Sequence, residues 1–146
     1  MHRLDDDQRR PYLDYSLSEK GGKKQPASDA APTVAITTSA GTGSEVDMAS
    51  VISKDDVQEK TGIFFPSMFP VLAVVDANLM MSVPPKFTAY QGMDAFFHAA
   101  ESVICKNESH GGNVALKAIE LVAKYLPQAY RDGSDKEARA YMALAN

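Results

Sequence analysis

The organisation of this chain follows from one stretch, Thr33-Val34-Ala35-Ile36-Thr37-Thr38-Ser39-Ala40-Gly41-Thr42-Gly43-Ser44-Glu45. Its first six residues are rich in β-branched side chains and are bounded by Pro32 and Gly41, which predicts a short buried strand. Two glycines and several hydroxyls follow directly, so backbone amides in this turn could approach a ligand closely. Such a turn suits a phosphate-bearing cofactor. A tight structural turn is about equally well supported by these residues alone.

Three standard motifs are excluded at the glycine-rich turn. A dinucleotide fingerprint needs a third glycine, and Val46 stands near that place. A P-loop needs Gly-Lys-Ser/Thr, and no lysine follows the glycines. A nucleophile elbow needs glycines on both sides of the serine at fixed offsets, and Ser44 lacks them.

The rest of the chain divides into a β-rich first half and a helical second half. We predict further strands at 51–53, 62–65 and 71–75, the last a continuous apolar run covered on both faces. Helices are predicted at 86–105, at 114–129 and after a capping box formed by Ser134 and Glu137. The boundary between the halves falls near Ser82 to Pro85.

Asp94 and His98 lie four residues apart in the apolar stretch 92–101, which predicts a helix buried on most sides. Residues at this spacing share a face, so a carboxylate oxygen and an imidazole nitrogen could reach one divalent metal ion. A metal would also offset the cost of burying the carboxylate. By themselves the two residues favour a simple Asp–His hydrogen bond over a metal site.

Composition narrows the class of protein. The chain has 146 residues, 45% of them hydrophobic and 23% charged, as in an ordinary globular domain. A net charge of −4 without a basic stripe argues against nucleic acid as a partner. No apolar run has the length of a membrane span, the N-terminus is too charged for a secretory signal, and there is one cysteine. We therefore expect a cytoplasmic protein.

Several blocks together resemble the iron-containing (group III) alcohol dehydrogenases. Residues 35–45 are similar to the family's Ala-Ile-Pro-Thr-Thr-Ala-Gly-Thr-Gly-Ser-Glu block, with Thr37 in place of the proline. Four further blocks follow in the family's order: Val75-Asp76-Ala77, Pro84-Pro85-Lys86, the region of Asp94, His98 and Glu101, and Leu126-Pro127-x-Ala129-Tyr130-x-Asp132-Gly133. The resemblance runs from about Tyr12 to the last residue.

The resemblance implies an incomplete dehydroquinate synthase-like fold. Residues 1–83 would be the C-terminal portion of an α/β nucleotide-binding domain, and 84–146 the first helices of an all-helical metal-binding domain. It implies hydride transfer between NAD or NADP and a small alcohol or aldehyde, with Fe(II) or Zn(II) as the metal.

The resemblance also assigns residues, none of them as an acid or base catalyst. Asp94 and His98 would be metal ligands, and the later histidine ligands of the family have no counterpart here. The cofactor would contact four residues, Thr38, Thr42, Asp47 and Lys60. With two ligands only, we expect the isolated chain to be inactive. The alternative is a degenerate or proteolysed remnant that acts only as a folded or oligomerising module, and a homo-oligomer is compatible with either.

Overall fold

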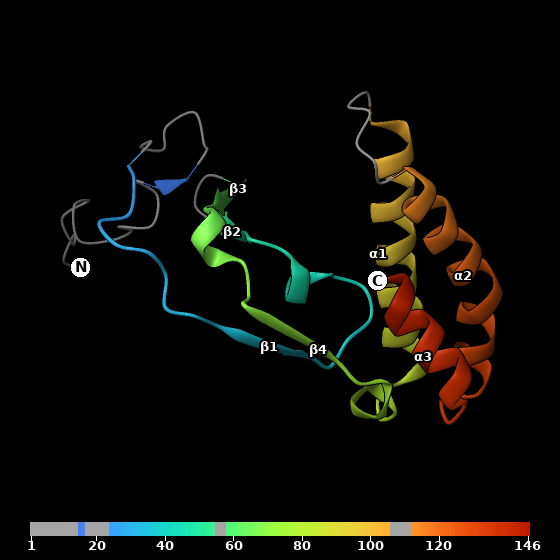
Figure 1. Cartoon of the computed structure of the whole chain (residues 1–146). Coiled ribbons are helices and arrows are strands. Elements are labelled where there is room, and N and C mark those ends of the chain that lie inside the picture. The colour runs from blue at the N-terminus through green and yellow to red at the C-terminus, as the bar shows by residue number, and fades with distance from the viewer. Residues whose placement is uncertain (1–14, 17–23, 55–57, 106–111) are drawn as a thin grey trace, which may run out of the picture. The chain divides into compact units, whose positions relative to one another are not determined.

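The computed structural model describes residues 15–16, 24–54, 58–105 and 112–146 (Figure 1). They form two compact units. Unit 1 comprises residues 1–33 and 46–71, and unit 2 comprises residues 34–45 and 72–146. No helix of the described residues is long and apolar enough to cross a membrane.

Unit 1 is built around an antiparallel pair of strands. Strand β2 (Ala49–Lys54) pairs with β3 (Glu59–Phe64), with Ala49 opposite Phe64 and Lys54 opposite Glu59. Gln58 has a left-handed φ of 53° just before β3, where the chain reverses. Residues 55–57, between the two strands, lie outside the described residues. A short 3-10 turn, η4 (Pro66–Met68), follows β3.

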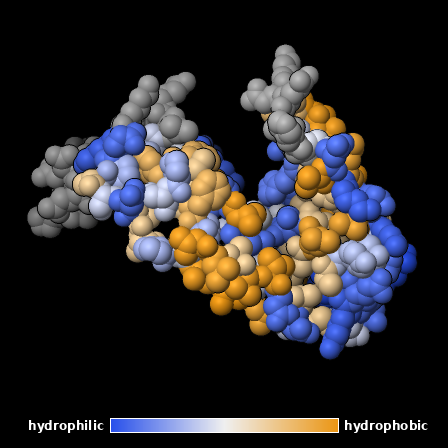
Figure 2. Space-filling view, in the orientation of Figure 1, coloured by the Kyte–Doolittle hydropathy of each residue, from blue (hydrophilic) through white to orange (hydrophobic). Residues whose placement is uncertain are grey.

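Unit 2 begins with a parallel pair of strands, β1 (Val34–Thr37) and β4 (Leu72–Val75), in the register Val34 to Leu72 and Thr37 to Val75. Both strands were predicted, but the prediction that they are buried is wrong. Val34, Ile36, Leu72 and Val75 are each about half exposed, and Figure 2 shows apolar atoms gathered over this pair. A buried parallel strand needs cover on both faces and both edges. The described residues supply one partner strand.

Three helices complete unit 2. They are α1 (Pro85–Ile104), α2 (Gly112–Arg131) and α3 (Lys136–Ala145), preceded by the short 3-10 turn η5 (Ala77–Met80). The helices confirm the predicted helical second half. Their core combines small and large apolar side chains, which lets the helices approach closely: Met80, Ala95, Leu121, Val122, Tyr125, Ala129, Ala138, Met142 and Ala143.

The starts of α1 and α3 have identifiable local causes. Proline at the first position of α1 has no N–H to leave unsatisfied. Helix α3 is capped by Asp135, whose side chain accepts from the Ala138 N–H at 2.9 Å. The predicted capping box of Ser134 and Glu137 is therefore wrong by one residue. Ser134 is used in the preceding turn, where its hydroxyl and N–H both donate to Asp132.

A buried arginine ties α3 to the beginning of α1. Arg139 is 4% exposed, and its guanidinium donates to the Thr88 hydroxyl at 2.8 Å, the Val83 carbonyl at 2.8 Å and the Gly133 carbonyl at 3.1 Å. Burial lowers the pKa of Arg139. These bonds fix where α1 starts, and α1 carries the candidate metal ligands.

Candidate functional site

Asp94 and His98 lie one turn apart on the same face of α1, as the spacing predicts. The His98 Nε2 atom is 3.6 Å from Asp94 Oδ1, and the two side chains are 54% and 47% exposed. The prediction that this helix is buried on most sides is wrong. Tyr90, Met93 and Phe97 are also exposed, and only the face bearing residues such as Ala95 packs into the core.

The separation of the two donor atoms fits one shared metal ion. Ligands about 2.1 Å from a metal at a tetrahedral angle lie about 3.4 Å apart, and the observed distance is 3.6 Å. A carboxylate oxygen and an imidazole nitrogen are suitable donors for Fe(II) and Zn(II). Within the described part of the chain no third histidine, cysteine, aspartate or glutamate joins them. The pair therefore accounts for two positions of a coordination sphere.

The glycine-rich turn packs against α1 next to this pair. A Cβ atom on Gly41 would lie 2.6 Å from the Gln91 carbonyl oxygen and 2.7 Å from its Cα, so the approach requires glycine. The Ala40 N–H also donates to the Gln91 side-chain oxygen at 3.4 Å. Gln91 precedes Asp94 by three residues, about 4.5 Å along a helix axis. The structure thus brings the turn to within about one helical turn of Asp94 and two of His98.

The side chains predicted to contact the cofactor from this turn are accessible. Thr38 and Thr42 are both exposed, and the Thr42 hydroxyl lies 3.1 Å from that of Ser44. The backbone amides are less available than expected for a phosphate site. The N–H groups of Ser39, Ala40 and Gly43 donate to the side chains of Thr37, Gln91 and Asn146, respectively. The turn therefore offers a ligand mainly its hydroxyl groups.

Asp47 and Lys60 belong to unit 1, whereas the turn, Asp94 and His98 belong to unit 2. Asp47 is exposed, and its carboxylate accepts from the N–H groups of Met48 at 2.6 Å and Ala49 at 3.1 Å. Lys60 is exposed on β3 opposite Ser53. The roles of both residues in cofactor binding stay predictions.

Three residues that sequence reasoning did not single out hold the turn in place. Gln91 contacts its first half, while Glu45 and Asn146 hold its second half. Gln91 is separated from Ala40 by 51 residues and Asn146 from Glu45 by 101. No local pattern marks such pairs.

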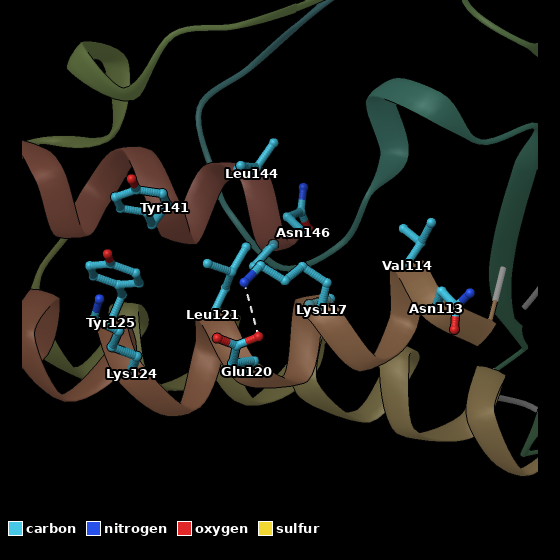
Figure 3. Close-up of a pocket in the computed structure, with 12 residues that line it drawn as sticks. Asn113, Val114, Lys117, Glu120, Leu121, Lys124, Tyr125, Tyr141, Leu144 and Asn146 are labelled. Atoms are coloured by element: carbon cyan, nitrogen blue, oxygen red, sulfur yellow. Dashed lines mark hydrogen bonds and ion pairs between the residues drawn. The ribbon is translucent and has the colours of Figure 1, made fainter.

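A separate groove of about 720 Å³ lies between α2 and α3 (Figure 3). In its wall the rings of Tyr125 and Tyr141 stack with centroids 4.2 Å apart, and Lys117 pairs with Glu120 at 2.9 Å. None of the six predicted site residues lines it. The candidate site is therefore the glycine-rich turn together with Asp94 and His98 on α1.

Comparison with known proteins identifies the family of the chain. Two family models match: iron-containing alcohol dehydrogenase over residues 3–77, and the C-terminal part of the Fe-containing alcohol dehydrogenase family over residues 88–146. Alcohol dehydrogenase 4 of Schizosaccharomyces pombe is 38% identical over 133 residues, covering 90% of this chain and 30% of that protein. An aldehyde-alcohol dehydrogenase of Clostridium acetobutylicum is 43% identical over 117 residues, covering 77% of this chain and 13% of that protein.

Solved structures give the same answer for the fold. Sulfoacetaldehyde reductase from Bifidobacterium kashiwanohense, solved in complex with NAD+, superposes with a TM-score of 0.80 at 38% identity, covering 90% of this chain and 34% of that one. This likeness confirms the predicted dehydroquinate synthase-like fold, present here in part. The chain spans about a third or less of the length of these relatives. It belongs to the iron-containing alcohol dehydrogenase family.

Proposed function

We propose that this chain is part of a metal-dependent alcohol dehydrogenase or aldehyde reductase that transfers hydride between NAD or NADP and a small alcohol or aldehyde. One observation carries the proposal: the glycine-rich turn contacts α1 at Gln91, about one helical turn before Asp94 and two before His98. A cofactor on the turn and a metal on the pair would then lie beside one another. In this proposal residues 1–83 belong to the cofactor domain and residues 84–146 to the metal domain.

The residues have distinct roles in this proposal. Asp94 and His98 bind the metal, Fe(II) or Zn(II), which when bound acts as a Lewis acid on the substrate oxygen. Thr38 and Thr42 orient the nicotinamide cofactor, which supplies the redox chemistry. Asp47 and Lys60 are proposed as further cofactor contacts. Asp94 and His98 are proposed as ligands and not as an acid or base. In alcohol oxidation the hydride passes to the cofactor and the hydroxyl proton, made more acidic by a bound metal, passes to solvent; in aldehyde reduction both return to the substrate.

Two protein ligands are too few for a tight catalytic site. Catalytic zinc sites, for comparison, use three protein ligands and leave a fourth position open. The Asp94 and His98 side chains are also about half exposed to solvent, which weakens binding by competition with water. We therefore propose that the 146-residue chain has no turnover by itself and works only with the ligands that a longer protein supplies.

A chimera tests the proposal. The 133-residue region of the Schizosaccharomyces pombe relative that matches this chain is replaced by this chain. We expect the chimera to reduce NAD with a small primary alcohol, and to contain about one metal per chain by elemental analysis. Asp94→Ala and His98→Ala should each lose both metal and activity. Glu101→Ala, an exposed carboxylate on the same helix, is the matched control and should keep both. Full metal content and activity in both ligand variants would refute the assignment.

A folded module without activity is the second candidate, and one observation favours it. The apolar residues Val34, Ile36, Leu72 and Val75 leave β1 and β4 exposed, and an exposed apolar strand pair promotes association. If the chain acts only in this way, light scattering of the purified protein will show an assembly that Ile36→Lys converts to a monomer. An active chimera, together with an isolated chain that stays monomeric in light scattering, would exclude the hypothesis that the chain acts only as a folded module.

A further inference from the structure

Glu45 is a buried carboxylate directly after the glycine-rich turn, and the proposed function gives it no role. It lies in the short 3-10 turn η3 (Ser44–Val46) and is 4% exposed. Its Oε1 atom accepts one hydrogen bond, from the Asn146 Nδ2 atom at 3.0 Å. Its Oε2 atom is buried and has no hydrogen-bond partner among the described residues. A carboxylate buried with one bond is expensive, so its presence needs a reason beyond stability.

Asn146 connects this carboxylate to the backbone of the turn. Its Oδ1 atom accepts from the Gly43 N–H at 2.9 Å, while its Nδ2 atom donates to Glu45. These two partners determine the orientation of the Asn146 side-chain amide. Reversing it would place its NH₂ group against the Gly43 N–H and its oxygen against the Glu45 carboxylate. The carboxylate of Glu45 is what makes one orientation favourable.

Gly43 is the point at which the turn needs to be fixed. Its φ of 60° is left-handed, a conformation that glycine enters and leaves at little cost. A Cβ atom placed on Gly43 would meet nothing within 4 Å, so the space where a side chain would lie is open. The hydrogen bond from the Gly43 N–H to Asn146 holds the residue. Asn146 follows α3, as Figure 3 shows, so the second half of the turn is attached to the end of that helix.

We propose that Glu45 is a positioning residue: its buried carboxylate orients the Asn146 amide, and that amide holds Gly43 in its left-handed conformation. The turn is then fixed at two places, by Gln91 of α1 at Ala40 and by Asn146 at Gly43. Thr42, the proposed cofactor contact, lies between them. The functional meaning of this inference rests on the proposed function, because it concerns the placement of a cofactor contact.

The test is made on the 146-residue chain without cofactor, by amide hydrogen exchange of Gly43 in NMR spectra. Glu45→Met removes the acceptor at similar volume, and Glu45→Gln keeps an oxygen that accepts from Asn146. We expect Gly43 to exchange about tenfold faster in Glu45→Met and within about twofold of the wild type in Glu45→Gln, since one hydrogen bond of ordinary strength is at stake. Glu101→Met, which alters an exposed carboxylate, is the matched control and should leave Gly43 unchanged.

A double-mutant cycle separates positioning from general destabilisation. Asn146→Ala should speed Gly43 exchange as much as Glu45→Met, and the double variant should be no faster than either, because both act through one amide. Additive effects, unchanged Gly43 exchange in Asn146→Ala, or failure of Glu45→Gln to preserve protection would overturn the proposal. If Glu45→Met does not fold, Asn146→Ala and its combination with Glu45→Gln decide the matter. Inactivity of the chimera would count against the proposed function alone, since no cofactor enters this measurement.

Discussion

Replacing Gly41 with alanine should displace the glycine-rich turn from α1. The new Cβ atom would lie 2.6 Å from the Gln91 carbonyl oxygen and 2.7 Å from its Cα, both backbone atoms of a helix that cannot yield locally. Ordinary contact begins at 3.4 Å, so the turn must move by about 0.8 Å. Overpacking of this kind costs about 1–3 kcal/mol in the free energy of unfolding. For a domain of this size that corresponds to a fall of about 4–12 °C in Tm.

Gly112→Ala is the matched control, because a Cβ atom there meets nothing within 4 Å. Thermal unfolding followed by circular dichroism compares the two variants with the wild type. In the chimera, a shift of nearly 1 Å in the turn should also lower kcat/KM by up to about 100-fold. A Gly41→Ala variant that matches Gly112→Ala in both Tm and activity would show that the close approach of the turn to α1 does not exist.

Three further predictions concern other parts of unit 2. Arg139→Met should lower the free energy of unfolding by about 2 kcal/mol in urea titrations, because three hydrogen bonds are lost. Arg139→Lys should recover less than half of this loss, because an ammonium group lacks the planar set of donors. A lysine variant as stable as the wild type would contradict this prediction. Hydrogen bonds from the Ser134 hydroxyl and then from its N–H lower the pKa of Asp132. Asp132→Asn should therefore reduce the free energy of unfolding at pH 6, and this loss should disappear as the pH falls below 4 and the wild-type carboxylate is protonated. An equal loss at both pH values would show that the charge of Asp132 does not contribute to stability. Calorimetry of the isolated chain should find Zn(II) and Fe(II) binding weaker than micromolar, and a submicromolar site lost in Asp94→Ala would show that two ligands suffice.

The elements themselves could be predicted because their causes are local. The β-branched run at 34–37 and the apolar run at 72–75 form the expected strands, and Pro85 begins α1 as its fixed φ and missing N–H allow. The shared face of Asp94 and His98 follows from helical spacing alone, and the distance between them agrees with it. The family could be identified because several separate blocks of residues agree, and the family models match over most of the chain.

Burial and long-range contacts could not be predicted, because each depends on which neighbours are present. An apolar run such as 71–75 indicates that a strand is suited to burial. Among the described residues this strand has one parallel partner, so it stays half exposed. The bonds of Glu45 and Gly43 to Asn146 join residues about 100 positions apart, and neither end has a local signature. The cap of α3 was missed for a smaller reason: Asp132 binds Ser134 and leaves Asp135 to begin the helix.

The bond between Gly43 and Asn146 also sets an order of events when the chain is made. The two residues are 103 positions apart, so the turn leaves the ribosome long before the residue that holds it. At about 5–20 residues per second, roughly 5–20 s pass between the synthesis of the two ends. The helices form from local contacts within microseconds of emerging. The second half of the turn can therefore be held by Asn146 only after α3 has been made, whereas Gln91 of α1 is available to its first half earlier.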